Sequence, residues 1–151
     1  MDYQTFSTLA PAARAALIDM GKAVEASGLD KGLLELIKLR ASQINGCAFC
    51  LDLHLDWARQ AGVSQRRIDL LPVWHEADVY SAAERAALAW TEALTHIEEG
   101  GPAAPDAADL SRHFSESEVL FLTVAIANIN AWNRIAGPLR FALPNSQSHA
   151  A

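Results

Sequence analysis

The chain lacks the long apolar runs that membrane-spanning helices require. Hydrophobic residues make up 51% of its 151 residues, yet the longest apolar candidate is FLTVAIANI, at 121–129. Crossing a bilayer takes about 18 or more such residues. The first residues also lack the basic region and apolar stretch of a secretory signal. We therefore expect a soluble, cytoplasmic protein that does not bind a membrane.

Basic residues are also few. The chain has 12 Lys and Arg residues against 18 Asp and Glu residues, which gives a formal charge of −6. The basic residues are scattered apart from pairs such as Arg66-Arg67. Because the phosphate backbone of a nucleic acid would be repelled on average, nucleic-acid binding is disfavoured.

Only two cysteines are present, Cys47 and Cys50. In a reducing compartment two thiols seldom form a structural disulfide. A loop closed between such near neighbours would also remove little conformational entropy from the unfolded chain. The pair therefore indicates a chemical role.

Patterns typical of β-strands are missing as well. No segment shows sustained alternation of apolar and polar residues, and no tandem repeat is evident. Helical periodicity instead predicts an all-α fold with one domain over residues 1–145 and a disordered tail over 146–151. The expected helices cover residues 10–27, 31–44, 47–61, 64–71, 82–97, 106–114 and 116–135, with a loop at 100–105.

Two of these helices carry distinctive side chains. The helix at 116–135 is apolar nearly all round, so we expect it to be central or to lie in a subunit interface. It also carries an unusual group of polar and aromatic residues, which either form buried hydrogen bonds or line a pocket near the thiols. These residues are Asn128, Asn130, Trp132, Asn133 and Arg134. The helix at 10–27 is expected to bury a face of Leu17, Met20, Ala23 and Val24, and the four tryptophans are expected in the core or an interface.

The cysteine segment places three reactive side chains on one helix face. At about 100° per residue, Cys47 and Cys50 lie within about 60° of each other, and His54 returns close to the direction of Cys47. Unsatisfied N–H groups and the helix dipole in the first turn favour a thiolate over a thiol. We therefore expect a lowered thiol pKa and an imidazole placed to take the proton.

This pattern also resembles that of a known family. Glu35, eleven residues, Cys47-Ala48-Phe49-Cys50, three residues and His54 match the signature of the AhpD-like alkylhydroperoxidases in the carboxymuconolactone decarboxylase superfamily. Segments 84–95 and 124–136 resemble its small single-domain branch, so the resemblance spans roughly residues 30 to 136. The founding peroxidase has a histidine where this chain has Phe49, so one member of the family's proton relay has no match there.

The resemblance implies a single-domain AhpD-like helical bundle and a thiol peroxidase without a cofactor. Cys50 would attack a peroxide, Cys47 would resolve the sulfenic acid to a disulfide, His54 would handle the proton and Glu35 would orient the ring. A lipoylated or thioredoxin-like dithiol protein would reopen the disulfide. Family members of this kind assemble as homo-oligomers, so a trimer or hexamer is expected.

Other interpretations of the same residues stay open. The cysteines are simple buried thiols in one of them, and a redox sensor without turnover in another. Cys47, Cys50 and His54 are also three zinc-type ligands, although no second Cys-x-x-Cys or His-x-x-x-His pair supplies a fourth. Without the resemblance, Glu35 would be interpreted as a surface carboxylate paired with Lys38 or Lys31. A lactone decarboxylase is the other enzyme implied by the superfamily, whose members of that type generally lack the cysteine pair.

Overall fold

The structure is a computed structural model that describes residues 2–96 and 107–144. Within those residues it contains eight α-helices, one short 3-10 helix and no strand, which confirms the all-α fold class. The helices are α1 (Tyr3–Leu9), α2 (Pro11–Glu25), α3 (Lys31–Ile44), α4 (Ala48–Gln60), α5 (Gln65–Leu70), η1 (Leu71–Val73), α6 (Ala82–Thr95), α7 (Ala107–Leu110) and α8 (Glu116–Ala136). The loop expected at 100–105 and the tail at 146–151 lie outside the described residues.

Helix starts follow the capping residues of the sequence. Asp30, Ser64, Ser81 and Ser115 each accept a hydrogen bond from a backbone N–H three residues on. Ser81 and Ser115 also form complete capping boxes. These local signals explain why the start of each of these four helices is predicted correctly.

Two short helices differ from the sequence prediction. Helix α1 has no predicted counterpart, because seven residues carry too little periodicity to separate a helix from a loop. Its start is nevertheless marked by Asp2, whose side chain accepts a hydrogen bond from the Thr5 N–H. Helix α7 covers only Ala107–Leu110 and is followed by a turn, so the helix expected over 106–114 is too long.

Helix α3 is the centre of the molecule. Leu34 and Ile37 pack into one apolar cluster with α2, α6 and α8, and Leu36 and Leu39 pack into a second cluster with α4, α5 and α6. Ala41 joins a third cluster around the cysteines. Because α3 is covered on nearly every side, any polar side chain on it needs a partner inside the protein.

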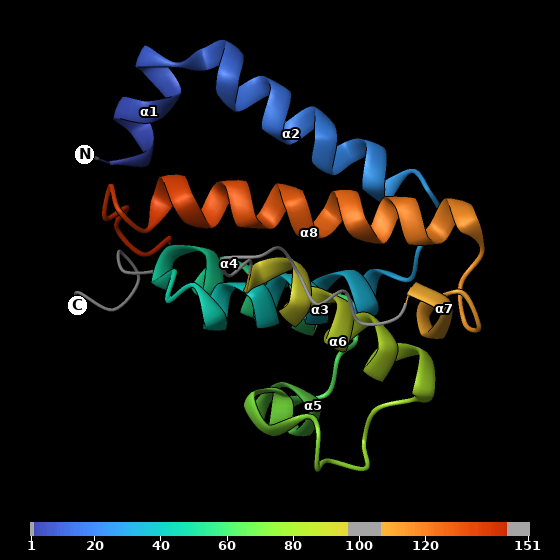
Figure 1. Ribbon diagram of the computed structural model, residues 1–151. Helices are drawn as coiled ribbons and strands as arrows, with labels where there is room; N and C mark the ends of the chain where they lie inside the picture. Colours follow the sequence, from blue (N-terminus) through green and yellow to red (C-terminus); the bar gives the residue numbers. More distant parts are fainter. Residues whose placement is uncertain (1, 97–106, 145–151) are drawn as a thin grey trace.

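Helix α8 runs the length of the molecule between α1 and α2 on one side and α3, α4 and α6 on the other (Figure 1). By length and composition it is the one helix among the described residues that could cross a membrane. It packs against α2, α3 and α6, as the core helix of a globular fold does. The predicted central position of this helix is confirmed.

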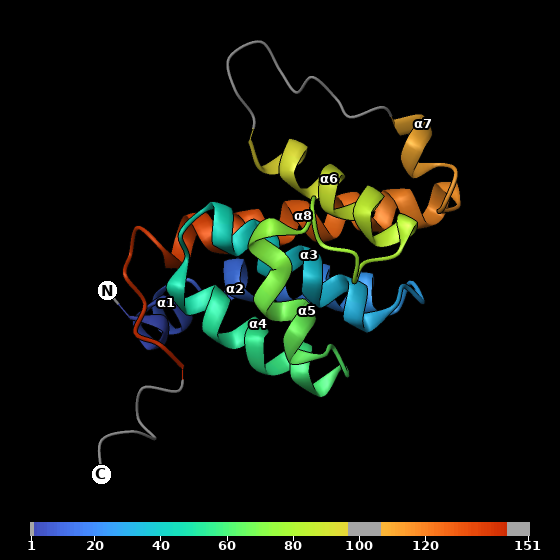
Figure 2. The same ribbon diagram turned by 90° about the horizontal axis from the view of Figure 1, so that it is seen from below.

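The chain comes back to α1 after α8. Phe141 lies against Tyr3 and Phe6, with ring centroids 5.9 Å and 6.0 Å apart. Figure 2 shows this last segment beside α1 at the same end of the molecule where α4 begins. The two ends of the described chain are therefore both placed at the cysteine end of the fold.

The turn between α3 and α4 depends on Gly46, whose φ is +63°. A Cβ there would meet nothing within 4 Å, so an alanine would be strained by its backbone alone. We expect Gly46→Ala to lower the free energy of unfolding by about 1 kcal/mol. Gly21→Ala, at an equally open position inside α2, is expected to raise it by about 0.5–1 kcal/mol. Urea denaturation of both variants measures the difference, and equal effects would contradict the backbone explanation.

Candidate functional site

The turn that carries Cys47 is anchored to α8 by buried amides. Asn45 Nδ2 donates to the side-chain oxygens of Asn130 and Asn133, at 2.9 Å and 3.0 Å. Asn133 Nδ2 in turn donates to Ser42 Oγ at 3.1 Å, and the Cys47 N–H donates to the Ser42 carbonyl at 3.0 Å. The hydrogen-bonding interpretation of these α8 amides is therefore correct, and it explains why such a long apolar helix carries them.

Cys47 is the N-cap of α4, and Cys50 lies in its first turn. Cys47 Sγ accepts a hydrogen bond from the Cys50 N–H at 3.3 Å, so the sulfur already occupies the place where a capping oxygen would accept. The two sulfurs are joined in a disulfide between Cα atoms 5.4 Å apart. Both residues are buried, at 1% and 3% exposure. The predicted sharing of one helix face is confirmed.

His54, one turn after Cys50, is held by α3. Its Nδ1 lies 2.6 Å from Glu35 Oε2, and the other carboxylate oxygen accepts from Lys38 Nζ at 2.8 Å. Glu35 and His54 are both buried. The interpretation of Glu35 as a surface carboxylate is therefore wrong, because α3 is enclosed on this side as well. Its predicted pairing with Lys38 is nevertheless present.

Burial and pairing act in opposite directions on these two groups. Burial alone raises the pKa of the Glu35 carboxyl, but the hydrogen bond to His54 and the charge of Lys38 outweigh it, so the pKa is lowered. Burial lowers the pKa of the His54 imidazole more than Glu35 raises it. Glu35 and Lys38 already balance each other's charge, so a protonated ring would leave a net positive charge inside. At neutral pH the pair is thus a carboxylate and a neutral imidazole that donates through Nδ1, which leaves Nε2 free to accept a proton.

This state of His54 predicts a specific pH dependence of stability. A lowered pKa in the folded protein means that the unfolded chain binds a proton first as the pH falls below about 6.5. Stability should therefore be complete above that pH and decrease below it, by at most about 1.4 kcal/mol per pH unit for one proton. The lowered pKa of Glu35 has the same effect at lower pH, so stability should decrease further below about pH 4.5.

Urea denaturation of the oxidised protein between pH 7.5 and 5 measures this effect. We expect His54→Gln to be less stable at pH 7.5 but to lose less stability than the wild type on acidification. The matched control is His75→Gln, since the His75 side chain is 60% exposed, and it should follow the wild-type curve. A wild-type curve that is flat between pH 7 and 5.5 would mean that His54 is not neutral in the folded protein.

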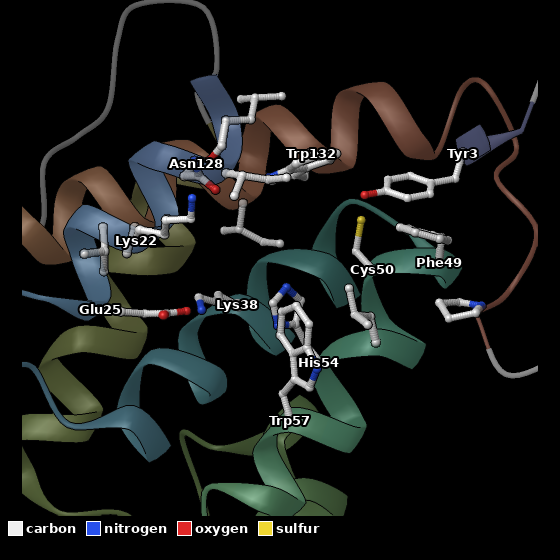
Figure 3. Close-up of a pocket in the computed structure, with 18 of the residues that line it drawn as sticks. Tyr3, Lys22, Glu25, Lys38, Phe49, Cys50, His54, Trp57, Asn128 and Trp132 are labelled. Carbon is white, nitrogen blue, oxygen red and sulfur yellow. Dashed lines mark hydrogen bonds between the residues drawn. The ribbon is translucent and has the colours of Figure 1, made fainter. Parts of the chain in front are cut away.

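A pocket of about 760 Å³ opens onto Cys50 and His54. Cys50 is among its lining residues and Cys47 is not. The lining comes from α1, α2, α3, α4, α8 and residues 142–144, and apolar surface dominates it. Figure 3 shows Lys22, Glu25, Lys38 and Asn128 at one end of the pocket, with Cys50, Phe49 and Tyr3 at the other. The pocket therefore has an apolar body, a polar end and a sulfur end.

Several pocket residues differ from their predicted roles. Trp57 is 42% exposed and lies edge-on to the His54 ring, with centroids 5.0 Å apart, so of its two expected places, core or interface, the core of this chain is not the one it occupies. Met20 and Ala23 are exposed and only Val24 of α2 is fully buried, so the buried face of α2 is narrower than predicted. Asn128 and Trp132 line the pocket, as one interpretation of the α8 residues expects. Tyr3 has no predicted role, and only the unpredicted helix α1 places it here.

The four predicted site residues thus meet in one place. Glu35 contacts His54, Cys47 is bonded to Cys50, and Cys50 shares the pocket with His54. Among residues 2–96 and 107–144, no group of three or more His, Cys, Asp or Glu side chains is arranged to hold a metal ion.

Comparison with known proteins gives two relatives by sequence. An uncharacterised protein of Bacillus subtilis, YdfG, is 38% identical over 134 residues, which cover 87% of this chain and 90% of that protein. The alkyl hydroperoxide reductase AhpD of Bradyrhizobium diazoefficiens is 37% identical over 82 residues. That second match covers 54% of this chain and only 38% of the relative.

Solved structures show the same fold. A protein of unknown function from Agrobacterium tumefaciens, described as a proposed antioxidant defence protein AhpD, superposes with a TM-score of 0.85 and 45% identity over 92% of this chain and 95% of its own. The debrominase Bmp8 superposes with a TM-score of 0.75 over 88% of this chain and 72% of its own. Its identity is 22%, so that likeness concerns the fold alone.

The family assignment rests on the sequence model of the carboxymuconolactone decarboxylase family, which matches residues 11–93. This stretch contains α2 to α6 almost completely, with both cysteines, Glu35 and His54. The chain therefore belongs to the carboxymuconolactone decarboxylase family and is AhpD-like in fold.

Proposed function

We propose that this protein is a thiol peroxidase that reduces an organic hydroperoxide through Cys50 and Cys47. The observation that carries the proposal is the placement of Cys50 in an apolar pocket beside His54, with Cys47 within bonding distance behind it. A related AhpD is named an alkyl hydroperoxide reductase, which agrees with this chemistry.

The proposed cycle starts from the reduced dithiol. His54 Nε2 takes the proton of the Cys50 thiol, and the thiolate attacks the terminal oxygen of the hydroperoxide. The O–O bond breaks with its electron pair on the alkoxide, which receives the proton from His54 and leaves as an alcohol. Cys50 is now a sulfenic acid. Cys47 attacks its sulfur, water leaves, and the disulfide forms.

Glu35 and Lys38 support this proton transfer without contacting the peroxide. Glu35 accepts from Nδ1 of His54, which fixes the tautomer with its free nitrogen at Nε2. When the ring takes up a proton, the carboxylate stabilises the imidazolium at 2.6 Å. Lys38 keeps Glu35 ionised and held in place, because its ammonium lies 2.8 Å from the second oxygen.

The pocket favours an organic substrate over hydrogen peroxide alone. A volume of about 760 Å³ lined mostly by apolar side chains exceeds what a two-oxygen molecule needs. Burying the alkyl part of a hydroperoxide there would contribute about 25 cal/mol per Å² of apolar surface. We therefore expect a lower KM for a bulky hydroperoxide than for hydrogen peroxide.

Completion of the cycle needs two electrons from a second dithiol. The accessible sulfur of the disulfide is that of Cys50, so a lipoyl group or a thioredoxin-like protein would attack there and release the Cys47 thiolate. A cytoplasmic location and a trimeric or hexameric assembly belong to the same proposal. Neither a cofactor nor a metal is required by it.

Peroxide consumption with dithiothreitol tests the proposal. The reduced protein should consume cumene hydroperoxide catalytically, and intact mass after one equivalent of peroxide should fall by two hydrogens. A redox sensor would show the same mass change without sustained consumption, and stoichiometric zinc in the purified protein would support the metal site. Conversion of a carboxymuconolactone without peroxide consumption would assign the lactone decarboxylase activity instead.

A further inference from the structure

Tyr3 brings a hydroxyl group to the sulfur end of the pocket. The residue lines the pocket, and its ring packs against the cluster that contains Cys47 and Cys50. Figure 3 shows the hydroxyl directed toward the Cys50 sulfur, opposite the polar end of the pocket. The ring is held by Phe49 and Phe141, with centroids 5.7 Å and 5.9 Å away. The two aromatic rings therefore hold the Tyr3 ring, and with it the hydroxyl, in a fixed position.

Arg14 determines which role this hydroxyl can take. Its Nε donates to the Tyr3 oxygen at 2.8 Å, so the oxygen already accepts a charge-assisted hydrogen bond. The phenol hydrogen must then point another way, and it finds no acceptor among residues 2–96 and 107–144. A hydroxyl that accepts from a guanidinium is also polarised into a stronger donor. Tyr3 is thus a donor with an unused hydrogen facing the pocket.

Three other polar side chains that line the pocket are already engaged and lie far from the sulfur. Lys22 and Lys38 are paired with Asp19 and Glu35, and the Asn128 amide donates to the Leu17 carbonyl. All three lie at the opposite end of the pocket from Tyr3 (Figure 3). Neutral His54 donates only through Nδ1, to Glu35, and becomes a donor at Nε2 once it has taken the thiol proton in the proposed cycle.

We propose that Tyr3 is a catalytic residue whose O–H donates a hydrogen bond to the leaving oxygen of the hydroperoxide, and that Arg14 positions and polarises it. This proposal rests on the proposed peroxidase function. As the Cys50 thiolate attacks the terminal oxygen, the O–O electron pair moves to the other oxygen, and the Tyr3 hydrogen bond strengthens as that alkoxide forms. The proton that neutralises the alkoxide still comes from His54, so Tyr3 keeps its own.

The test compares Tyr3→Phe with the wild type in single-turnover reactions of the reduced protein. With tert-butyl hydroperoxide, whose alkoxide is a poor leaving group, we expect the rate constant of disulfide formation to fall about 10-fold to 100-fold. With peracetic acid, which releases a stable carboxylate, Tyr3→Phe should lower this rate constant by a factor several times smaller. Alkylation of Cys50 by iodoacetamide has no oxygen leaving group, so its rate should stay within about twofold of the wild type.

Two further variants complete the test. Tyr80→Phe is the matched control, because the Tyr80 hydroxyl donates to the Arg67 carbonyl away from the pocket, and it should react with peroxide at the wild-type rate. With tert-butyl hydroperoxide, Arg14→Met should lower the rate constant of disulfide formation less than Tyr3→Phe does. The double variant should lower this rate constant no more than Tyr3→Phe alone.

Each result has a definite meaning. Equal rates for Tyr3→Phe and the wild type with tert-butyl hydroperoxide would overturn the role of Tyr3 and leave the peroxidase function intact. A parallel loss in iodoacetamide alkylation would also overturn it, because Tyr3 would then act on the thiol or on folding. Failure of the wild-type protein to react with any peroxide would remove the proposed function and this role together.

Discussion

Replacing Cys50 with serine is expected to abolish peroxide consumption, with a loss of roughly a thousandfold or more. The reason is that Cys50 is the sulfur exposed to the pocket and lies one helical turn before His54. A serine hydroxyl is a far weaker nucleophile at neutral pH and cannot be oxidised to a sulfenic acid. Cumene hydroperoxide consumption with excess dithiothreitol measures the loss.

Cys47→Ser is the matched variant for this experiment. It keeps Cys50 in the pocket and, through the serine hydroxyl, keeps an N-cap acceptor for the Cys50 N–H. We expect it to react once with peroxide and to stop at the sulfenic acid, which dimedone traps as a covalent adduct detectable by mass. A dimedone adduct in Cys50→Ser and none in Cys47→Ser would reverse the assigned roles of the two cysteines.

The local features of this protein were accessible from sequence because they depend on near neighbours. The capping residues Ser81 and Ser115 sit next to the helices they start, and the spacing of Cys47, Cys50 and His54 needs only the geometry of one helix. The structure accordingly joins Cys47 to Cys50 and places Cys50 and His54 in one pocket, while Cys47 is the N-cap of α4 and not its first helical residue.

The remaining features depend on how distant helices pack, which the sequence does not state. Trp57 resembles a core residue by type, but the side of α4 that it occupies faces the pocket. Tyr3 reaches the site only because α1 folds back against α8 and the segment around Phe141. Its chemical type gives no signal of that contact, so nothing in the sequence distinguishes Tyr3 from other tyrosines.

The environment of Glu35 depends both on its neighbours along α3 and on the packing of distant helices. Its pairing with Lys38 follows from their separation of three residues on one helix. Its burial follows from the packing of α3 between α4, α6 and α8. The same ion pair that would contribute little on a surface therefore becomes an internal one, with consequences for folding and for the proposed catalysis.

Glu35→Ala is expected to lower the free energy of unfolding by about 3 kcal/mol, because it leaves the Lys38 ammonium without its partner in a mostly buried site. Urea denaturation at pH 7.5 measures this loss. Peroxide consumption should fall as well, by about 100-fold, since His54 loses the group that fixes its tautomer and stabilises its protonated form. Glu35→Gln keeps a hydrogen-bond acceptor for His54 and should lose less in both measurements.

The double variant Glu35→Leu with Lys38→Met separates the two contributions. Replacing a buried ion pair by apolar side chains of similar size is often neutral or stabilising, so most of the lost free energy of unfolding should return. The part that does not return is the cost of the buried His54 Nδ1–H, which has lost its acceptor. Activity should not return, because Nδ1 of His54 would still lack a carboxylate. Recovery of both stability and activity would mean that Glu35 only holds the fold together. Loss of activity with recovered stability would show that the Glu35 carboxylate acts on His54 in the proposed reaction as well as stabilising the fold.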